Sequence, residues 1–394
     1  MSTEETAAPR AAPPFDGLLL AAILGLAAVG AVMVYSASAI PAAQSRRLGF
    51  DEFYYLKRQL LAGAMGLALM AAALKLGPRR IATLAYPLLA ATLVALVLVP
   101  FVGKTAGGAQ RWIPLGPLQF QPAEAAKVVL VLYLARSLSR KQEKVRLFSI
   151  GVLPHLVVTA VFVLLCLVQR DLGTGVILFV VLLAMLFAAG ARVGYLLLAA
   201  VLAVPVAWHL VKSTPYRWVR VMAFLDPERY RAGPGFQLWE SLLGTANGGF
   251  FGQGLGQGKG KLFYLPAAHT DFIAAVIAEE AGLLGMLLLL ALFAVVVWRG
   301  LRAALNASDA FGCYAALGVT TLLGAQALVN FAVVFGLLPT KGLTLPFVSY
   351  GGSSLMTLLG ASGVLLAVSG ERGGFLRQPV AAVRIVPVAA GGAS

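Results

Sequence analysis

The chain has 394 residues, of which 60% are hydrophobic and 12% are charged, with a formal net charge of +15. Soluble domains carry about a quarter charged residues, so this composition excludes an ordinary soluble enzyme and indicates an integral membrane protein. The positive charge does not indicate nucleic acid as a partner, because the bases lie in short clusters between apolar runs. The two cysteines, Cys166 and Cys313, lie inside such runs and are expected to be buried, and the three histidines are too scattered for a metal site.

Long apolar segments predict an all-α, polytopic membrane protein with about ten transmembrane helices. A spanning helix needs about 20 mostly apolar residues, and a few of the segments are shorter. The first apolar run, which extends over residues 17–45 without a charge, is too long for the apolar core of a cleaved signal peptide, so we expect it to remain as a helix. The predicted helices are 17–37, 59–75, 81–103, 122–136, 148–168, 174–190, 194–211, 271–297, 310–335 and 352–369.

Basic clusters predict the orientation, because short cytoplasmic loops carry an excess of Lys and Arg. With the N-terminus in the cytoplasm, the clusters fall on the inner side and both termini are cytoplasmic. The chain then divides into a cytoplasmic tail (1–15), a transmembrane domain (16–370) and a second cytoplasmic tail (371–394), which we expect to be disordered because it lacks a periodic apolar pattern. The inner bases are Lys75, Arg79, Arg80, Arg136, Arg140, Lys141, Lys144, Arg146, Arg192, Arg299, Arg302, Arg372 and Arg377.

A long extracytoplasmic loop, about 212–270, is predicted between the seventh and eighth helices. Its bases either form a solvated face near lipid headgroups or attract an anionic substrate at the outer leaflet. They are Lys212, Arg217, Arg220, Arg229, Arg231, Lys259 and Lys261. The loop also holds GGFFGQGLGQGKG, Gly248 to Gly260, which lacks the GK[ST] ending of a phosphate-binding P-loop. We expect these glycines to permit tight turns or close backbone approach.

Ionisable groups beside membrane helices are costly and indicate candidate functional residues. Glu124 and Lys127 share one face of a helix that begins at Pro122, where they form either a structural ion pair or part of a site. Asp271 lies where the outer loop becomes an apolar helix, so it is either a helix cap or a general base with a pKa tuned by burial. Glu279 and Glu280, about two turns further on, suggest inward-facing polar contacts.

Two shorter outer segments add candidate residues. Asp171 lies in a turn between two helices, where Gly173 and Gly175 are expected to form the bend. Arg111 and Trp112 offer a cation and an amphipathic ring, although Trp is common at membrane interfaces without any function. No Ser-His-Asp arrangement is defensible from the sequence.

The segment LPTKGLTLPFVSYGGSS, Leu338 to Ser354, places many polar groups beside the last helix. Lys341 is suited to bind a phosphate, and Ser353 and Ser354 are suited to cap the helix after a sharp turn at Gly351 and Gly352. In the predicted topology this segment, Asp271, Asp171 and the Glu124/Lys127 pair all meet at the outer face. Such convergence predicts a binding or catalytic site.

These segments together resemble one family, the SEDS proteins, which are the RodA/FtsW peptidoglycan glycosyltransferases. The resemblance covers roughly residues 16–370. It depends on GAQRWIPLGPLQFQPAEAAK, RDLGTG, FLDP, KLFYLPAAHTDFIAAVIAEE and LPTKGLTLPFVSYGGSS, in this order. The last motif, with MVYSAS in the first helix, is more similar to the division branch (FtsW) than to the elongation branch (RodA). The chain departs from the family at Ala123, usually serine, and at Arg170, commonly proline, which affects local hydrogen bonding only.

The resemblance implies that the chain polymerises lipid II at the outer face of the cytoplasmic membrane, in septal synthesis, with Asp271 as the catalytic base. It implies a class B penicillin-binding protein transpeptidase and other divisome membrane proteins as partners, and it leaves open a divalent cation, Mg²⁺ or Mn²⁺, on the substrate pyrophosphate. The residues expected to support Asp271 or to bind substrate are Glu124, Lys127, Lys341, Arg111, Trp112, Asp171, Arg217, Arg220, His269, Thr270, Ser349, Tyr350 and Ser353.

Two alternatives to the enzyme stay open. A lipid II flippase needs a path open to both leaflets, and inverted repeats would support one, but no convincing internal repeat is visible. A non-catalytic scaffold for the division transpeptidase leaves the clustered polar segments without a role.

Overall fold

The computed structural model describes residues 15–106, 109–116, 118–258 and 268–371. Nearly all of both predicted tails therefore lies outside the described residues, as do Lys259 and Lys261 of the outer loop. The expected disorder of the C-terminal tail consequently stays a prediction.

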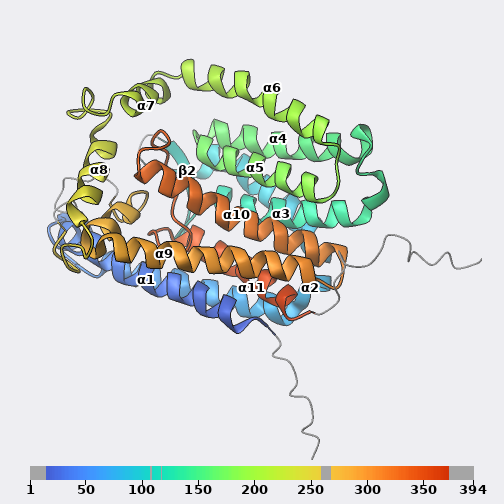
Figure 1. Ribbon diagram of the computed structural model, residues 1–394, viewed down its shortest axis with the longest axis horizontal. Helices are drawn as coiled ribbons and strands as arrows, with labels where there is room; N and C mark the ends of the chain where they lie inside the picture. The colour runs from blue at the N-terminus through green and yellow to red at the C-terminus, as the bar shows by residue number, and fades with distance from the viewer. Residues whose placement is uncertain (1–14, 107–108, 117, 259–267, 372–394) are drawn as a thin grey trace, which may run out of the picture.

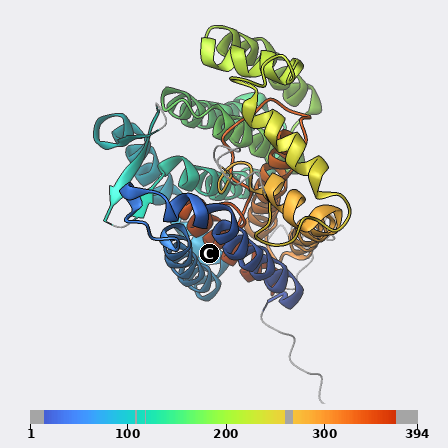
Figure 2. The same ribbon diagram turned by 90° about the vertical axis from the view of Figure 1, so that its left-hand side faces the viewer.

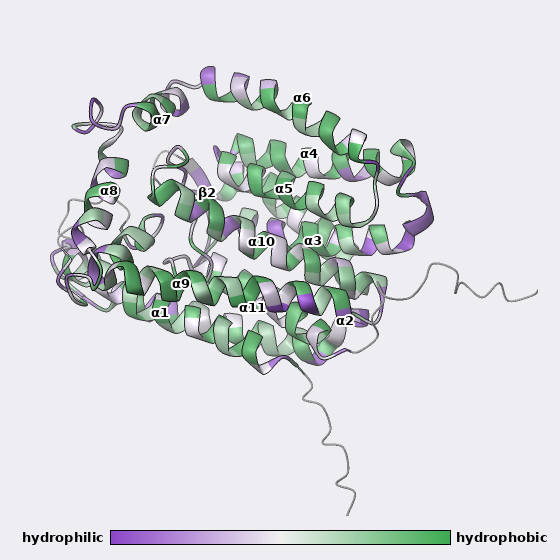
Figure 3. Cartoon of the chain, viewed as in Figure 1, coloured by the Kyte–Doolittle hydropathy of each residue, from purple (hydrophilic) through white to green (hydrophobic). Residues whose placement is uncertain are grey.

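The described chain is a bundle of α-helices that run largely alongside one another (Figure 1). The helices are α1 Gly17–Ala43, α2 Tyr54–Val102, α3 Pro122–Arg140, α4 Leu153–Val168, α5 Leu172–Ala188, α6 Val193–Lys212, α7 Pro215–Leu225, α8 Phe236–Gly248, α9 Ile273–Asn306, α10 Ala310–Val334 and α11 Gly352–Ser369. A π-helical turn, Phe148–Val152, leads into α4. Figure 3 shows hydrophobic residues along the helices and hydrophilic residues gathered mainly at their ends.

Seven helical segments of the described chain are long and apolar enough to cross a membrane: α1, α2, the turn with α4, α6, α9, α10 and α11. The prediction of an all-α, polytopic membrane protein is thus confirmed. The most apolar part of α6 is only 6% buried, and this helix lies along the outer edge of the bundle in Figure 1. By contrast, α10 is largely buried between α3, α5 and α9.

The number of crossings stays a prediction, because α2 covers two of the predicted helices. Its 49 residues would span about 74 Å as one straight helix, which is more than twice the ~30 Å hydrocarbon core. Gly77 breaks it with φ 71° and ψ 164°, directly before Pro78. The charged helix α3 and the 17-residue α5 occupy two further predicted positions.

A small antiparallel sheet joins α2 to α3, where the sequence pattern gave no sign of strands. It consists of β1 Lys104–Ala106, β2 Ala109–Leu115 and β3 Leu118–Phe120, in that order. Lys104 is paired with Trp112, and Ile113 with Phe120. Gly116, between β2 and β3, takes the left-handed φ of 58°. These strands are too short, and too rich in glycine and proline nearby, for a clear alternating pattern.

The predicted long outer loop contains helices α7 and α8, and its glycine-rich part docks into a break in α9. The break lies at Gly282, with φ 65° and ψ −160°. Backbone groups that the break leaves unpaired are satisfied by the loop: Gln253 N donates to Glu279 O (2.9 Å), and Leu283 N donates to Gly249 O (3.0 Å). A Cβ at Gly252 would lie 2.2 Å from the Glu280 carbonyl oxygen, so the expected close backbone approach is confirmed.

The beginning of α1 and the end of α11 meet at one end of the bundle. Asp16 caps α1, its backbone N–H donates to Ser369 Oγ (3.0 Å), and its carboxylate pairs with Arg299 of α9. The beginning of α9 lies at the opposite end, which faces the viewer in Figure 2. Cys166 and Cys313 are buried free thiols, as expected.

Candidate active site

The segment that bears Asp271 is hydrogen-bonded along its backbone to the segment 338–354. Tyr350 N donates to His269 O (2.8 Å). Ser349 Oγ donates to Thr270 O (2.6 Å) and accepts from Leu345 N (2.8 Å). The two segments are therefore held together by one backbone bond and by the Ser349 hydroxyl, which together hold the residues just before Asp271 in place.

Asp271 is a partly exposed carboxylate that lies two residues before α9 begins at Ile273. It does not cap this helix, since the N-cap residue is Phe272 and no side chain makes a capping bond. A Cβ at Gly342 would lie 3.2 Å from Asp271 Oδ2, so the neighbouring segment passes directly over the carboxylate. Burial raises the pKa of Asp271 to about 6, against the lowering effect of Arg220 and Arg111, and Asp171 adds to the rise. Such a group is ionised at neutral pH and is suited to accept a proton.

Two arginines reach this region from separate elements. Arg220 of α7 donates to Thr340 O (3.3 Å), and its guanidinium lies 4.5 Å from the ring centre of Tyr216. Arg111 of β2 donates through Nε to Gln169 O (3.0 Å) and through Nη2 to Arg170 O (2.7 Å). They place positive charge near Asp271.

Arg217 and Trp112, two further residues predicted from the outer segments, make no hydrogen bond or ion pair with Asp271 within the described part of the chain. Arg217 donates to Leu210 O (3.1 Å) near the end of α6, which is a helix-ending contact. Trp112 lies beside Arg111 on β2 and is partly exposed.

Asp171 is the N-cap of α5. Its carboxylate accepts from Thr174 N (3.1 Å), from Thr174 Oγ1 (2.9 Å) and from Gln121 Nε2 (3.3 Å). The expected bend at Gly173 and Gly175 is wrong, because both lie in the first turn of the helix. The bend is made at Arg170, with φ 60°.

The expectation that Ser353 and Ser354 cap α11 is also wrong. The N-cap is Gly351, without a side-chain bond. Ser353 Oγ instead accepts from Gln121 N (2.9 Å) and donates to Gln119 O (2.7 Å), which ties α11 to the beginning of α3. The Ser353 hydroxyl therefore serves a contact between distant segments, which no sequence pattern marks, and the Ser354 hydroxyl contacts Thr344 Oγ1 (3.1 Å) within the segment 338–354.

Glu124 and Lys127 form an ion pair of 2.8 Å in which the Lys127 side chain is 0% exposed. Lys127 Nζ also donates to Gln326 Oε1 (2.8 Å), and Gln326 Nε2 donates to Thr344 O (2.8 Å). The pair is therefore connected through α10 to the segment 338–354.

His269 lies two residues before Asp271 in the chain, and Lys341 belongs to the segment 338–354, next to Gly342. Lys341 is partly buried, and burial lowers its pKa. The ring of His269 lies 4.6 Å from that of Tyr55 and 5.6 Å from that of Tyr350. Burial lowers the pKa of His269 to about 4, so it is neutral at physiological pH.

Glu279 and Glu280 are buried and face inward, as expected. The Glu280 carboxylate accepts from Ser36 Oγ (2.9 and 2.7 Å) and from Gly256 N (3.0 Å). It thereby holds the glycine-rich segment against α1 and α9.

Sequence reasoning missed two amides of α10, Gln326 and Asn330, because it searched for ionisable groups. They are spaced i, i+4 in an otherwise apolar helix, so they share one face. Paired amides at this spacing in an apolar segment are the signal that would have found them.

The described residues do not form a cage for Mg²⁺ or Mn²⁺. No group of three or more His, Cys, Asp or Glu side chains in the described part of the chain could hold a metal ion. The Asp171 carboxylate accepts the hydrogen bonds that cap α5.

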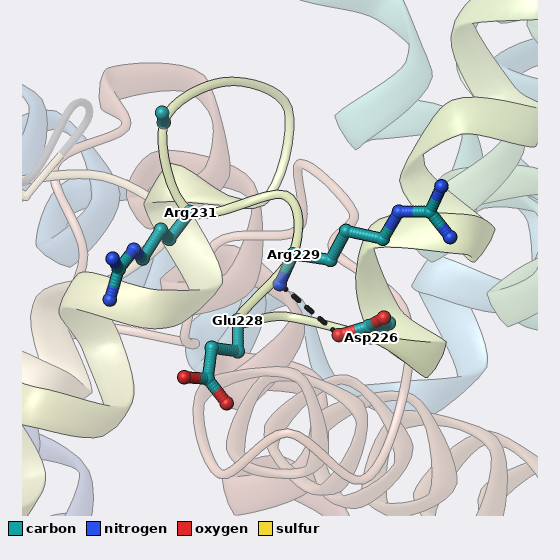
Figure 4. A pocket seen from close by; sticks show the side chains of 5 residues that line it. Asp226, Glu228, Arg229 and Arg231 are labelled. Atoms are coloured by element: carbon teal, nitrogen blue, oxygen red, sulfur yellow. Dashed lines mark hydrogen bonds between the residues drawn. The ribbon is translucent and has the colours of Figure 1, made fainter.

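A solvent-open hollow of about 460 Å³ lies between α7 and α8, lined by Asp226, Glu228, Arg229, Arg231 and Ala232. Figure 4 shows that Arg229 and Arg231 point in opposite directions, while Arg229 N donates to Asp226 Oδ1 (3.1 Å). The two arginine side chains therefore do not converge within this hollow.

Fold and site define a polytopic, all-α membrane protein with a carboxylate-centred polar site at one end of the bundle. The family model described as "Cell cycle protein", which covers FtsW, RodA and SpoVE, matches residues 17–373, and the chain belongs to this family.

Relatives and solved structures agree with this family. The probable peptidoglycan glycosyltransferase FtsW of Geobacter sulfurreducens is 46% identical over 90% of this chain and 95% of its own length. Stage V sporulation protein E of Bacillus subtilis is 41% identical over 90% and 96%. A chain of a peptidoglycan synthase complex that coordinates polymerization and crosslinking matches with TM-score 0.73 and 34% identity, over 90% and 97%. Thermus thermophilus RodA matches with TM-score 0.67 and 31% identity, over 91% and 97%.

Proposed function

We propose that this chain is a peptidoglycan glycosyltransferase that polymerises lipid II into glycan strands during septal cell-wall synthesis. The observation that carries the proposal is Asp271, a single carboxylate with its pKa raised to about 6 and two arginines nearby. The names of the relatives support the reaction, and the similarity to proteins named FtsW supports the division role.

Asp271 acts as the general base in a single displacement. It accepts the proton of the acceptor sugar 4-hydroxyl as that oxygen attacks the anomeric carbon of the growing strand. The new C–O bond forms while the bond from the anomeric carbon to undecaprenyl pyrophosphate breaks, and the pyrophosphate leaves with its electron pair. One carboxylate suffices for this, unlike in a retaining glycosidase with its carboxylate pair about 5 Å apart.

The cations Arg111, Arg220 and Lys341 stabilise the charge that develops on the leaving pyrophosphate. Lys341 is the most direct candidate, because its neighbour Gly342 passes over the Asp271 carboxylate. The site then lies on the extracytoplasmic side, with both termini in the cytoplasm. A class B penicillin-binding protein crosslinks the product strand, and other divisome membrane proteins complete the assembly.

The test is a polymerisation assay on lipid II with purified protein, in the presence and absence of the cognate transpeptidase. Asp271→Ala is compared with Asp51→Ala, which removes a surface carboxylate paired with Lys57. We expect glycan strands from the wild type and from Asp51→Ala, and a loss of at least about 10³-fold for folded Asp271→Ala, because the essential base is gone.

Two results would contradict the proposal in different ways. Polymer from Asp271→Ala at the wild-type rate would keep the reaction and remove Asp271 as its base. No polymer from any variant with the transpeptidase present would favour the flippase or the scaffold instead.

A further inference from the structure

We propose that Asn330 is a positioning residue for the glycosyl transfer, which holds the peptide carbonyl of Asp271 against the segment that carries Lys341. The inference rests on the proposed function of Asp271. Asn330 lies on α10 and its side chain is 2% exposed, so it acts through Asp271 and not on the substrate.

The geometry uses both protons of one amide group. Asn330 Nδ2 donates to Asp271 O (2.9 Å) and to Leu343 O (2.7 Å). A hydroxyl has one proton to donate and an ionised carboxylate has none, so neither replaces this bridge. One turn earlier on the same face, Gln326 donates to Thr344 O (2.8 Å). Helix α10 thus presents two amides to consecutive carbonyls of the segment 338–354.

The bond from Asn330 completes a continuous set of backbone contacts at the base. The carbonyls of His269, Thr270 and Asp271 accept in turn from Tyr350 N, Ser349 Oγ and Asn330 Nδ2. The first two donors belong to the segment 338–354, which is itself a loop, whereas Asn330 belongs to a buried helix. Through Asn330, the buried helix α10 therefore holds the backbone of Asp271 in position. Since Asp271 has a short side chain, its carboxylate direction follows its backbone, and a displacement of 1 Å can cost about 10²-fold in rate.

The amide of Asn330 carries a stability cost as well as two hydrogen bonds. Asn330 Oδ1 is buried and has no hydrogen-bond partner among the described residues, and an unpaired buried acceptor is destabilising. A leucine of similar size would remove that cost, but it would also leave the carbonyls of Asp271 and Leu343 without this donor. Stability alone therefore does not separate a positioning role from a structural one, and the test needs kcat beside the melting temperature.

The test compares Asn330→Leu, which keeps the volume and removes both donors, and Asn330→Ala with a matched control. The control is Thr320→Val on the same helix, which removes a buried hydroxyl that bonds to its own helix, at Ala316 O (2.7 Å).

Melting temperature, kcat, KM for lipid II and the pH profile of kcat are measured for each. We expect both Asn330 variants to fold and to lose about 10²-fold in kcat, with KM within about twofold. We also expect the acid limb of their pH profiles to move to lower pH, because a carboxylate that is better hydrated has a lower pKa. The charged groups that act on this carboxylate are Arg220, Arg111 and Asp171.

Three outcomes would contradict the proposal, and they differ in which part they contradict. An inactive wild type would contradict the proposed function and, with it, the role of Asn330. Failure of the proposed function is therefore distinguishable from failure of the positioning role, which requires an active wild type. With an active wild type, a kcat for Asn330→Leu equal to that of Thr320→Val would overturn the positioning role. Unfolding of both Asn330 variants with a folded Thr320→Val would also overturn it, by assigning Asn330 to stability.

Discussion

At the scale of single residues, the site depends on a carboxylate that is partly removed from water but remains ionisable. Burial disfavours the charged form of Asp271 and raises its pKa, and Arg220 and Arg111 limit the rise. A base with a pKa just below neutral pH is ionised in the cell and still accepts a proton readily.

The pKa of Asp271 predicts the acid limb of the activity profile. The base works only when deprotonated, so kcat should be full above pH 7 and fall about tenfold per pH unit below about pH 6. Rates of lipid II polymerisation between pH 4.5 and 8, with stability checked at each pH, measure this limb. A rate independent of pH down to 4.5 would contradict the assignment.

The Glu124–Lys127 pair is predicted to stabilise the protein because neither charge can be left alone in the interior. Lys127→Met should lower the free energy of unfolding by about 3–5 kcal/mol, and Glu124→Gln/Lys127→Met should recover most of that loss. Lys57→Met is the matched control, since its partner Asp51 is solvent-accessible and such a surface pair contributes at most about 1 kcal/mol. Unfolding in detergent measures all of these. Equal stability of the single and double variants would show that the buried charges are not coupled.

At the scale of elements, the fold depends on backbone groups that one element leaves unpaired and another segment satisfies by hydrogen bonds. The break in α9 at Gly282 leaves backbone groups that the glycine-rich segment satisfies, and α8 packs closely beside it. Asn330 and Gln326 show the same logic, since side chains of α10 satisfy carbonyls of two loops. Each such contact joins segments far apart in sequence.

A pair of glycines on α8 tests the contact with α9. A Cβ at Gly248 would lie 1.9 Å from Ala278 O, whereas one at Gly244, a turn earlier, would lie 3.9 Å from its nearest neighbour, Glu279 Oε2. Gly248→Ala should therefore destabilise the protein by about 1–3 kcal/mol, and Gly244→Ala should be neutral or stabilising by up to about 1 kcal/mol. Melting temperatures of both variants decide this. A neutral Gly248→Ala would show that the two helices do not pack this closely.

At the scale of the whole molecule, the polar site and the paired chain ends lie at opposite ends of the bundle. Asp16, Arg299 and Ser369 join α1, α9 and α11 at one end, and α9 begins at the other, beside Asp271. If the chain ends are cytoplasmic, as predicted, this separation puts the site on the extracytoplasmic side.

The predicted orientation is tested by cysteine labelling, for which the buried native thiols Cys166 and Cys313 give little background. Ser213→Cys, an exposed position at the end of α6, should react with a membrane-impermeant maleimide in intact cells. Gln142→Cys, exposed between α3 and α4, should react only after the membrane is permeabilised. The reverse pattern would invert the topology and place the site in the cytoplasm.

The sequence by itself determined the membrane class, most helix positions and the candidate base. These follow from hydropathy and from charges beside apolar segments, which are properties of short stretches of chain. Only the tertiary structure decided which polar groups meet. The break in α9, the contacts of Ser353 and the amides of α10 all depend on other segments of the chain, whereas the strands next to α2 pair locally but are too short for a clear alternating pattern. A local pattern can mark the amides of α10 as candidates by their spacing, but it does not say which carbonyls they contact, because those carbonyls belong to other segments.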